Sequence, residues 1–367
     1  MIKISFAGGV GEFGKNMTVL EQDGAILVLD VGAMFPETDL PGIDLVIPEF
    51  DFLEDRADDI AGLVLTHGHE DHIGAAPFFL ERFPVPVWSA PFTLGLLRKK
   101  MRDVGLDIPD STVLEPNSPC QIGPFRLEGI PVTHSIPDAL SLVVKTPDAT
   151  ILHSGDFKFD QSPLDRRLTH YRRFHEIGEE GVTVLLMDST NVEVEGMTGS
   201  ERLALGGIEK YVAEQEGQIF VSLFATNLMR IQSIYNLAAR YRKKVALFGR
   251  TLIANTKVAE EVGYLKVPAG VSIAVEEVAD LIDDFQQPAG GKADETILGI
   301  FARQGDELGE IRGVGGREIL ADRVGDDGDE AEFFTTELEG DVEAEPVDAV
   351  IRIGLDGGEE FAGVVGG

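Results

Sequence analysis

The sequence predicts an α/β protein, and three observations support this prediction. Short apolar runs alternate with turns and a few helix-like segments over the first 190 residues. Most of these runs end in a polar or glycine-rich turn, an arrangement that places functional side chains along one edge of a sheet. From residue 200 to 284, helix-like and strand-like segments alternate as in a small doubly wound unit.

The individual elements follow from these periodicities and from the turn residues between them. In the first part we expect strands at 2–7, 17–21, 25–31, 62–66, 86–89, 125–131, 140–145, 151–153 and 182–187, and helices at 73–82 and 91–102. In the second part we expect helices at 201–215, 228–240 and 253–263, and strands at 218–224 and 244–248. Beyond about residue 286 the chain is acidic and glycine-rich, with a short β-like run at 349–353.

The composition excludes several classes of protein. A chain of 367 residues with 43% hydrophobic residues is long enough to bury a sizeable core. A single cysteine, Cys120, excludes an internal disulfide framework and a cysteine-rich zinc module. No apolar run reaches the ~18 residues that a membrane span needs, and the N-terminus lacks a basic segment before its apolar stretch. We therefore expect a cytoplasmic protein without a membrane partner.

The net charge of −33 is distributed unevenly. Residues 288–367 contain 21 acidic and 6 basic residues, so they carry nearly half of this charge. Such a charge argues against a broad nucleic-acid-binding surface, because phosphate backbones attract clustered Lys and Arg. A locally positive cleft could still hold RNA on an acidic protein.

The run His67-Gly-His69-Glu-Asp71-His72 follows the apolar run 62–65 and is the strongest sign of chemistry. Four potential ligands within six residues of one loop can converge on two metal ions roughly 3.5–4 Å apart. Imidazole and carboxylate ligands without thiolate suit zinc, or manganese if oxygen donors dominate. The alternatives are a polar surface loop with Asp71 as a helix cap, and a structural zinc, although structural sites favour cysteine-rich shells.

Two further strand ends carry ligand types. His134 follows the strand predicted at 125–131, and Asp156 follows the strand predicted at 151–153. Alone, His134 would more often be a structural histidine and Asp156 a turn residue. Beside the histidine-rich motif, both become candidate ligands. We assign no role to His153, which we expect to be packed as part of the structure.

These residues together resemble the signature of the metallo-β-lactamase fold. The resemblance implies an αββα sandwich in which Asp30 matches the aspartate after the first motif strand. It also implies that Asp30 orients the ligand loop by hydrogen bonds without touching the metal. The other expected roles are one zinc held by His67, His69 and His134, a second held in part by Asp71 and His72, and Asp156 bridging the two ions.

Several flanking segments are similar to ribonuclease J, a two-metal RNase of the β-CASP subgroup. The segments GGVGEFGKNM, THSIPDA, HSGDFKFD and LLMDSTNVEVEGMTGSE carry the resemblance in the first part, and SLFATNLMRIQSIYNLAARYRKKVALFGRT carries it in the second. The similarity covers residues 2–273. It implies a metallo-β-lactamase domain at 1–197, a partial β-CASP-like α/β domain at 198–285, and a divergent acidic segment of unknown structure at 286–367.

The resemblance implies a zinc-dependent ribonuclease that hydrolyses RNA phosphodiester bonds with water activated by two metal ions. It would be a 5′–3′ exonuclease, an endonuclease or both, acting in RNA processing and decay, with Asp71 and Asp156 as catalytic residues. Two zinc ions per chain are expected, with manganese or magnesium as alternatives. The implied partners are RNA, further copies of the chain in a dimer or tetramer, and other RNA-decay proteins.

Polar residues at two further loops are candidate RNA or phosphate contacts. Asp188 matches the first β-CASP motif, and the adjacent side chains of Ser189, Thr190 and Asn191 are small donors. Thr226, Asn227 and Arg230 precede or begin a helix whose N-terminus could receive a phosphate. The alternatives are ordinary helix capping and a salt-bridged arginine. For the glycine-rich run GGVGEFGKN, a tight turn is favoured over a phosphate cradle.

The resemblance ends near residues 279–286. No histidine follows His175, so the family's later motif histidines have no counterpart and the second metal site is incomplete; a GSQGEP-like stretch is also absent. Three explanations stay open: a variant with a new tail, a truncated or frame-disrupted product, and a non-catalytic relative that binds RNA or a partner subunit. A thioester or lactone hydrolase is a more distant alternative, because it would not require the β-CASP-like segments.

Overall fold

The computed structural model divides the chain into two compact units, Met1–Met197 and Thr198–Gly367. It describes residues 1–36, 40, 42–190, 192–196, 199–214, 219–275 and 277, together with the backbone of five later strands at 297–303, 317–321, 333–337, 350–356 and 359–365. Within these residues, no helix is both long and apolar enough to cross a membrane.

The first unit contains two sheets. The strands of the first sheet lie side by side in chain order: β1 (Lys3–Gly8), β2 (Met17–Gln22), β3 (Ala25–Leu29), β4 (Ile60–Val64), β5 (Val87–Ser89) and β6 (Ser111–Val113). From β3 to β6 the pairing is parallel. The second sheet has the order β11-β10-β9-β8-β7, with β7 (Cys120–Ile122), β8 (Phe125–Pro131), β9 (Leu140–Lys145), β10 (Thr150–His153) and β11 (Val184–Leu186).

The two sheets pack face to face over one apolar core. This core contains fully buried leucines of the first sheet, such as Leu27 and Leu29, and of the second, such as Leu127 and Leu142. Alternation along the strands explains the arrangement, because every second side chain of a strand points to the same face. Removal of this apolar area from water is the main force that holds the sheets together.

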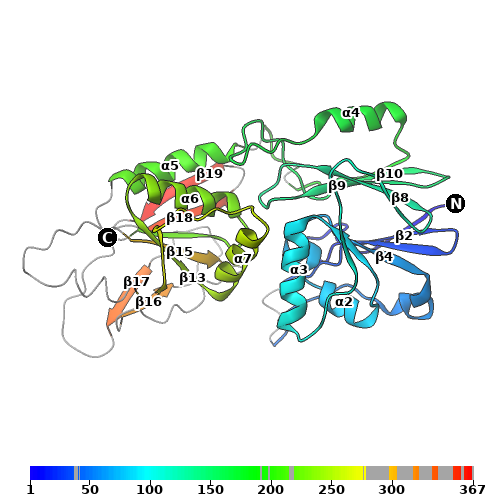
Figure 1. The fold of residues 1–367 in the computed structure, drawn as a ribbon, viewed down its shortest axis with the longest axis horizontal. Helices are drawn as coiled ribbons and strands as arrows, with labels where there is room; N and C mark the ends of the chain where they lie inside the picture. The colour runs from blue at the N-terminus through cyan, green and yellow to red at the C-terminus, as the bar shows by residue number, and fades with distance from the viewer. Residues whose placement is uncertain are drawn as a thin grey trace, which may run out of the picture. The chain divides into compact units, whose positions relative to one another are not determined.

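Helices cover the outer faces of both sheets, which gives four layers (Figure 1). On one side lie α1 (Glu70–Ile73), α2 (Ala76–Arg82) and α3 (Pro91–Asp103), and a 3-10 helix at Asp51–Asp59 precedes β4. On the other side lies α4 (Tyr171–Glu180), whose Phe174 and Ile177 pack on Ile130 and Val143 of the second sheet. The predicted αββα sandwich is confirmed.

The helix predicted at 73–82 is two helices, α1 and α2, separated by Gly74 and Ala75. Pro77 lies in the first turn of α2, where its missing N–H costs no hydrogen bond. In the first unit the periodicity did not predict β6, β7, α4 or the 3-10 helix at Asp51–Asp59, which are short or carry few apolar residues.

The second unit contains a sheet of order β14-β13-β15-β12-β18-β19. The strands are β12 (Ile219–Phe224), β13 (Lys244–Phe248), β14 (Ser272–Ile273), β15 (Ile297–Arg303), β18 (Val350–Asp356) and β19 (Glu359–Val365), and the helices are α5 (Glu201–Glu214), α6 (Leu228–Arg240) and α7 (Arg250–Glu261). Two strands of the acidic segment, β15 and β18, pair in parallel with β12, one on each side. A separate hairpin joins β16 (Arg317–Ala321) and β17 (Phe333–Glu337).

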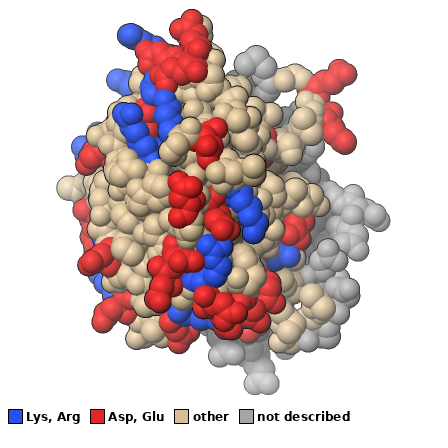
Figure 2. Space-filling model, turned by 90° about the vertical axis from the view of Figure 1, so that its right-hand side faces the viewer, with Lys and Arg blue, Asp and Glu red and all other residues tan. Residues whose placement is uncertain are grey.

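Acidic and basic side chains stand beside one another on the face of the first unit that Figure 2 shows. The best-formed ion pair is that of Arg173, on α4, with Glu128 of β8. The guanidinium donates from Nε and Nη2 to the two carboxylate oxygens at 2.7 and 2.8 Å, and the Glu128 side chain is only 7% exposed. A bidentate pair with one nearly buried partner fixes α4 on the second sheet.

We expect Arg173→Met to lower the free energy of unfolding by about 2–3 kcal/mol, because it leaves the buried Glu128 carboxylate without its cation. Urea unfolding followed by the fluorescence of Trp88, the only tryptophan, reports on this unit. Arg172→Met is the matched control, since Arg172 is 85% exposed and its pair with Glu176 is a surface pair. Equal effects of the two substitutions would contradict the prediction.

Candidate metal centre

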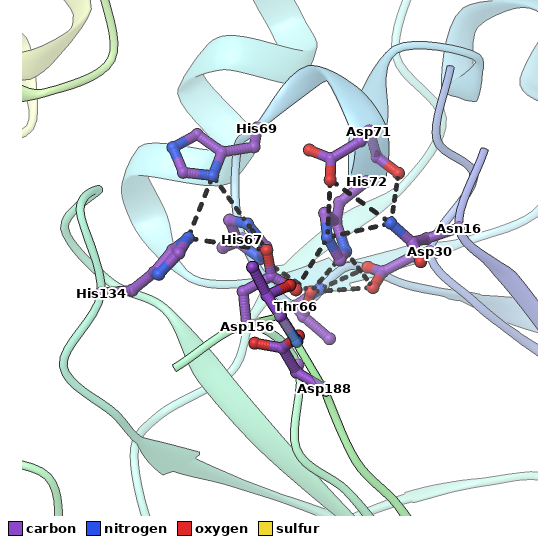
Figure 3. A network of polar contacts seen from close by, with 12 residues as sticks. Asn16, Asp30, Thr66, His67, His69, Asp71, His72, His134, Asp156 and Asp188 are labelled. Atoms are coloured by element: carbon purple, nitrogen blue, oxygen red, sulfur yellow. Dashed lines mark hydrogen bonds and ion pairs between the residues drawn. The ribbon is translucent and has the colours of Figure 1, made fainter. Parts of the chain in front are cut away.

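The candidate metal centre lies where strands of both sheets end. β4 leads into the turn that carries His67 and His69, and α1 begins directly after His69. His134 follows β8, and Asp156 follows β10. Figure 3 shows that these side chains, from loops far apart in sequence, point toward one another.

The first group of potential ligands consists of His67, His69, His134 and Asp156, whose ligand atoms all lie within 4.8 Å of one another. His69 Nδ1 lies 3.0 Å from His67 Nε2 and 3.1 Å from His134 Nε2. On a tetrahedral zinc with zinc–nitrogen bonds of roughly 2.0–2.1 Å, nitrogen ligands are ~3.3 Å apart. The three imidazoles therefore have nearly the spacing that one zinc ion requires.

The second group consists of His67, Asp71 and His72, within the same limit of 4.8 Å. Asp71 Oδ2 lies 3.4 Å from His72 Nε2. Asp156 lies between the two groups: its Oδ1 is 3.1 Å from His72 Nε2, and its Oδ2 is 3.7 Å from His134 Nε2. One carboxylate thus presents an oxygen to each group, and the donor set of imidazole and carboxylate fits two divalent ions.

Burial makes three of the imidazoles neutral. It lowers the pKa of His67 far below its ordinary value and also lowers the pKa of His69. Burial, followed by the charge of His69, lowers the pKa of His134 to about 3. A neutral imidazole keeps one nitrogen lone pair free, and this is the form that binds a metal ion.

His72 differs from the other three. Burial lowers the pKa of His72, but the charges of Asp71 and Asp30 and the hydrogen bond that His72 donates to Asp156 outweigh burial and raise this pKa well above its ordinary value. Burial in turn raises the pKa of Asp71, but the charge of His72 outweighs it, so that this pKa is low. Three carboxylates around one nearly buried imidazole favour a positive charge there, from a proton or from a metal ion.

Asp30 orients the ligands of the second group. It follows β3, which pairs in parallel with β4, so that it lies beside the residues that follow β4 and reaches Thr66. Its Oδ1 accepts a hydrogen bond from the backbone N–H of Thr66 at 2.7 Å, and its Oδ2 lies 2.8 Å from His72 Nδ1. A bond from Nδ1–H to this carboxylate leaves His72 Nε2 facing Asp71 and Asp156, as in carboxylate–histidine–metal arrangements.

Thr66 is a site residue that the sequence analysis missed. The side chain is fully buried, and its Oγ1 lies 2.8 Å from Asp30 Oδ2 and 3.0 Å from His67 Nδ1. A carboxylate only accepts hydrogen bonds, so the hydroxyl must donate to Asp30 and accept from His67 Nδ1–H. This fixes the tautomer of His67 and leaves its Nε2 for a metal ion. Thr66 is the last residue of the strand predicted at 62–66, and a threonine at the end of a strand does not by itself indicate this role.

Asn16, in the glycine-rich run interpreted as a tight turn, was also missed. Its Nδ2 donates to the backbone carbonyl of Asp71 at 3.0 Å and lies 3.2 Å from His72 Nε2. The backbone N–H of Asn16 donates to the same carbonyl. Gly32 allows this approach, because a Cβ at that position would lie 1.5 Å from the carbonyl oxygen of Asp71. The run thus holds the ligand loop from the side opposite His134.

The other predicted residues of the first unit lie at the edge of the site. Asp188 is drawn with the metal-site residues in Figure 3, and its backbone N–H donates to Ser154 Oγ at 2.8 Å. Ser189 and Thr190 follow it and are exposed, whereas Asn191 lies outside the described residues. Burial lowers the pKa of His153, and its Nδ1 accepts a hydrogen bond from the backbone of Gly155 at 3.1 Å.

In the second unit, Asn227 caps α6, where its side chain accepts a hydrogen bond from the backbone N–H of Arg230. Arg230 Nε donates to Glu201 Oε2 at 2.8 Å, and both side chains are buried. Thr226 is partly exposed in the preceding turn. These contacts are those of the capping and salt-bridge alternatives, and an RNA contact at these residues stays a prediction.

Comparisons with known proteins agree with this geometry. A profile of the metallo-β-lactamase superfamily matches residues 10–193, and a profile of the ribonuclease J β-CASP domain matches residues 216–285. Ribonuclease J of Thermus thermophilus is 43% identical over 291 residues, which are 77% of this chain and 50% of that protein. Ribonuclease J of Helicobacter pylori is 36% identical, over 83% of this chain and 45% of that protein. Ribonuclease J of Mycobacterium tuberculosis is 42% identical, over 72% of this chain and 48% of that protein.

A crystal structure of a protein of unknown function from Enterococcus faecalis has the same fold, with a TM-score of 0.57 and 18% identity, over 84% of this chain and 78% of that one. The chain spans about half the length of the curated relatives it matches. The sequence resemblance to ribonuclease J is confirmed by the two profiles and these relatives. With a superfamily profile that covers half of its residues, the chain belongs to the metallo-β-lactamase superfamily, and its residues 216–285 match the ribonuclease J β-CASP domain.

Proposed function

We propose that the protein is a zinc-dependent ribonuclease that hydrolyses RNA phosphodiester bonds. The observation that carries the proposal is the convergence of His67, His69, His134 and Asp156 on one point, beside a second group with His72 and Asp71. The similarity to ribonuclease J over most of this chain supports RNA as the substrate. Exonuclease and endonuclease action both agree with this proposal.

In this proposal, the four ligands of the first group would hold zinc, and Asp71, His72 and Asp156 would hold a second ion. Zinc at this site would lower the pKa of a coordinated water to roughly 7 and polarise the phosphoryl group. The carboxylate of Asp71 is 37% exposed and ionised, so it could orient an attacking water by accepting a hydrogen bond from it. Asp156 keeps the two positions at a fixed separation, because its two oxygens face different groups.

The alternative function is a non-catalytic relative that binds RNA or a partner subunit. The observation that favours it is that no histidine follows His175, so the second group lacks a later histidine ligand. A cytoplasmic location, an oligomer and other RNA-decay partners stay predictions from the resemblance.

Zinc content provides the first test. We expect the purified chain to hold one tightly bound and one weakly bound zinc ion, and His69→Ala to lose the tight ion, because it removes a ligand of the first group. Elemental analysis after gel filtration measures this. His175→Ala is the matched control, since His175 is 74% exposed on α4. A zinc content that is the same in the two variants would contradict the assignment of the ligands.

Degradation of RNA provides the second test. We expect the zinc-loaded chain to shorten 5′-monophosphorylated single-stranded RNA, and His69→Ala to reduce the rate at least ~100-fold because the ionised water is lost. Gel electrophoresis of labelled RNA separates exonuclease products from endonuclease products. If the zinc-loaded chain leaves RNA intact at high protein concentration but still binds it, the non-catalytic alternative replaces the proposal.

Substitution of Thr66 tests the hydrogen bonds behind the ligands. Thr66→Val keeps the shape but removes the hydroxyl, which leaves Asp30 Oδ2 and His67 Nδ1–H without this partner. We expect about tenfold weaker zinc binding in competition with a coloured chelator. Thr66→Ser keeps the hydroxyl and should bind zinc nearly as the wild type does. Equal affinities of the two variants would show that the hydroxyl does not position His67.

A further inference from the structure

Residues 157–173, here called the aromatic–basic segment, begin directly after the candidate ligand Asp156. They include five basic residues, Lys158, Arg166, Arg167, Arg172 and Arg173, and two acidic residues. The first 197 residues contain 15 basic and 32 acidic residues, so one third of the basic residues lie in these 17 positions. The segment thus has a positive net charge in a unit whose net charge is negative.

The segment is attached to the loop that carries His134. The backbone N–H of Lys158 donates to the carbonyl of Thr133 at 2.8 Å, and Thr169 Oγ1 accepts from the backbone N–H of Thr133 at 2.9 Å. Arg167 Nη1 lies 3.7 Å from the carboxylate of Asp138, four residues after His134. Both ends of the segment therefore lie beside the metal ligands.

Three aromatic rings of the segment form a continuous row. The ring centroids of Phe157 and Phe159 are 5.2 Å apart, and those of Phe159 and Tyr171 are 5.8 Å apart. Phe159 is 52% and Tyr171 38% exposed, although large apolar side chains gain free energy when they are buried. Phe159 is three residues from Asp156, so their Cα atoms lie within ~11 Å of each other.

The charges that face solvent along the segment are mainly basic. Of the two acidic residues, Asp160 is buried and accepts a hydrogen bond from the backbone of Ser162. Asp165 is exposed and accepts a hydrogen bond from the backbone N–H of Arg167. Arg166 is exposed, and among the described residues its side chain makes no ion pair. Arg167 is 55% exposed at its long contact with Asp138.

We propose that the aromatic–basic segment is a binding surface for single-stranded RNA next to the metal centre. Bases stack on Phe159 and Tyr171, and Arg166 and Arg167 contact the phosphates on either side. Exposed aromatic rings interleaved with basic side chains suit single-stranded nucleic acid, because every base has a face that can stack and every nucleotide carries a negative charge. An acidic partner chain would pair with the basic side chains but would leave the exposed row of aromatic rings without a function. This inference rests on the proposed ribonuclease function and adds the place where the substrate strand lies.

The test measures RNA affinity. The zinc-loaded full chain is titrated into fluorescein-labelled single-stranded oligo(A) RNA with phosphorothioate linkages, which resist cleavage, and fluorescence anisotropy is recorded at several salt concentrations. We expect Phe159→Ala to raise Kd about tenfold, whereas Phe159→Tyr keeps the affinity because it keeps the ring. We expect Arg166→Gln to raise Kd about threefold and to reduce the slope of log K against log salt by about 0.7.

Two matched controls lie at the opposite ends of strands that lead to the site. Phe52 is 49% exposed in the 3-10 helix before β4, and Arg126 is exposed at the start of β8. Phe52→Ala and Arg126→Gln should leave Kd and the salt slope unchanged.

If the wild type binds RNA but Phe159→Ala and Arg166→Gln bind as it does, this inference is wrong and the proposed function stands. If the wild type neither binds nor cleaves RNA, the proposed function and this inference both fail. Circular dichroism and Trp88 fluorescence establish that each variant is folded, and Phe159→Tyr separates loss of the ring from a general disturbance.

Discussion

The carboxylate of Asp30 is the contact on which the rest of the site depends. It is 1% exposed and lies within hydrogen-bond distance of the Thr66 backbone, the Thr66 hydroxyl and His72 Nδ1. A buried carboxylate is costly unless such donors surround it. The parallel pairing of β3 and β4 provides this geometry, because the two strands end side by side. The orientation of two ligand imidazoles is therefore set by a sheet and not by a mobile loop.

The metal centre combines neutral imidazoles with ionised carboxylates. His67, His69 and His134 are held neutral by burial, while Asp71, Asp156 and Asp30 surround His72. One half of the site thus offers lone pairs and the other half offers negative charge. A divalent ion satisfies both, since it accepts the lone pairs and neutralises the carboxylates. The three carboxylates at the site are therefore a requirement of metal binding, and RNA has to be held by other residues.

Short-range patterns were sufficient for most strands and for part of the site, because apolar alternation predicts strands and HGHEDH places four potential ligands in one turn. The αββα sandwich and the position of His134 and Asp156 beside this turn were implied by the resemblance to the metallo-β-lactamase signature, since these loops are far apart in sequence. Thr66 and Asn16 could not be recognised in this way. Their roles arise from contacts with Asp30 and with the carbonyl of Asp71, and neither partner is near in sequence. The amphipathic α4 was missed because it buries only Ile177 fully and half of its ten residues are Arg or Glu.

The sheet of the second unit includes strands that lie beyond the matched β-CASP residues. The β-CASP profile match ends at residue 285, and the similarity to the Helicobacter pylori ribonuclease J covers 83% of this chain. β12 pairs with β15 and β18, which both lie beyond the end of the profile match. A parallel sheet is stable only when its central strands have neighbours on both sides, since unpaired backbone groups at an open edge are costly. Strands from beyond the profile match can therefore complete the sheet. Completion of a sheet requires backbone pairing and apolar alternation, whereas completion of a metal shell requires particular side chains at particular positions. A segment without histidine can do the first and cannot add an imidazole ligand to the second.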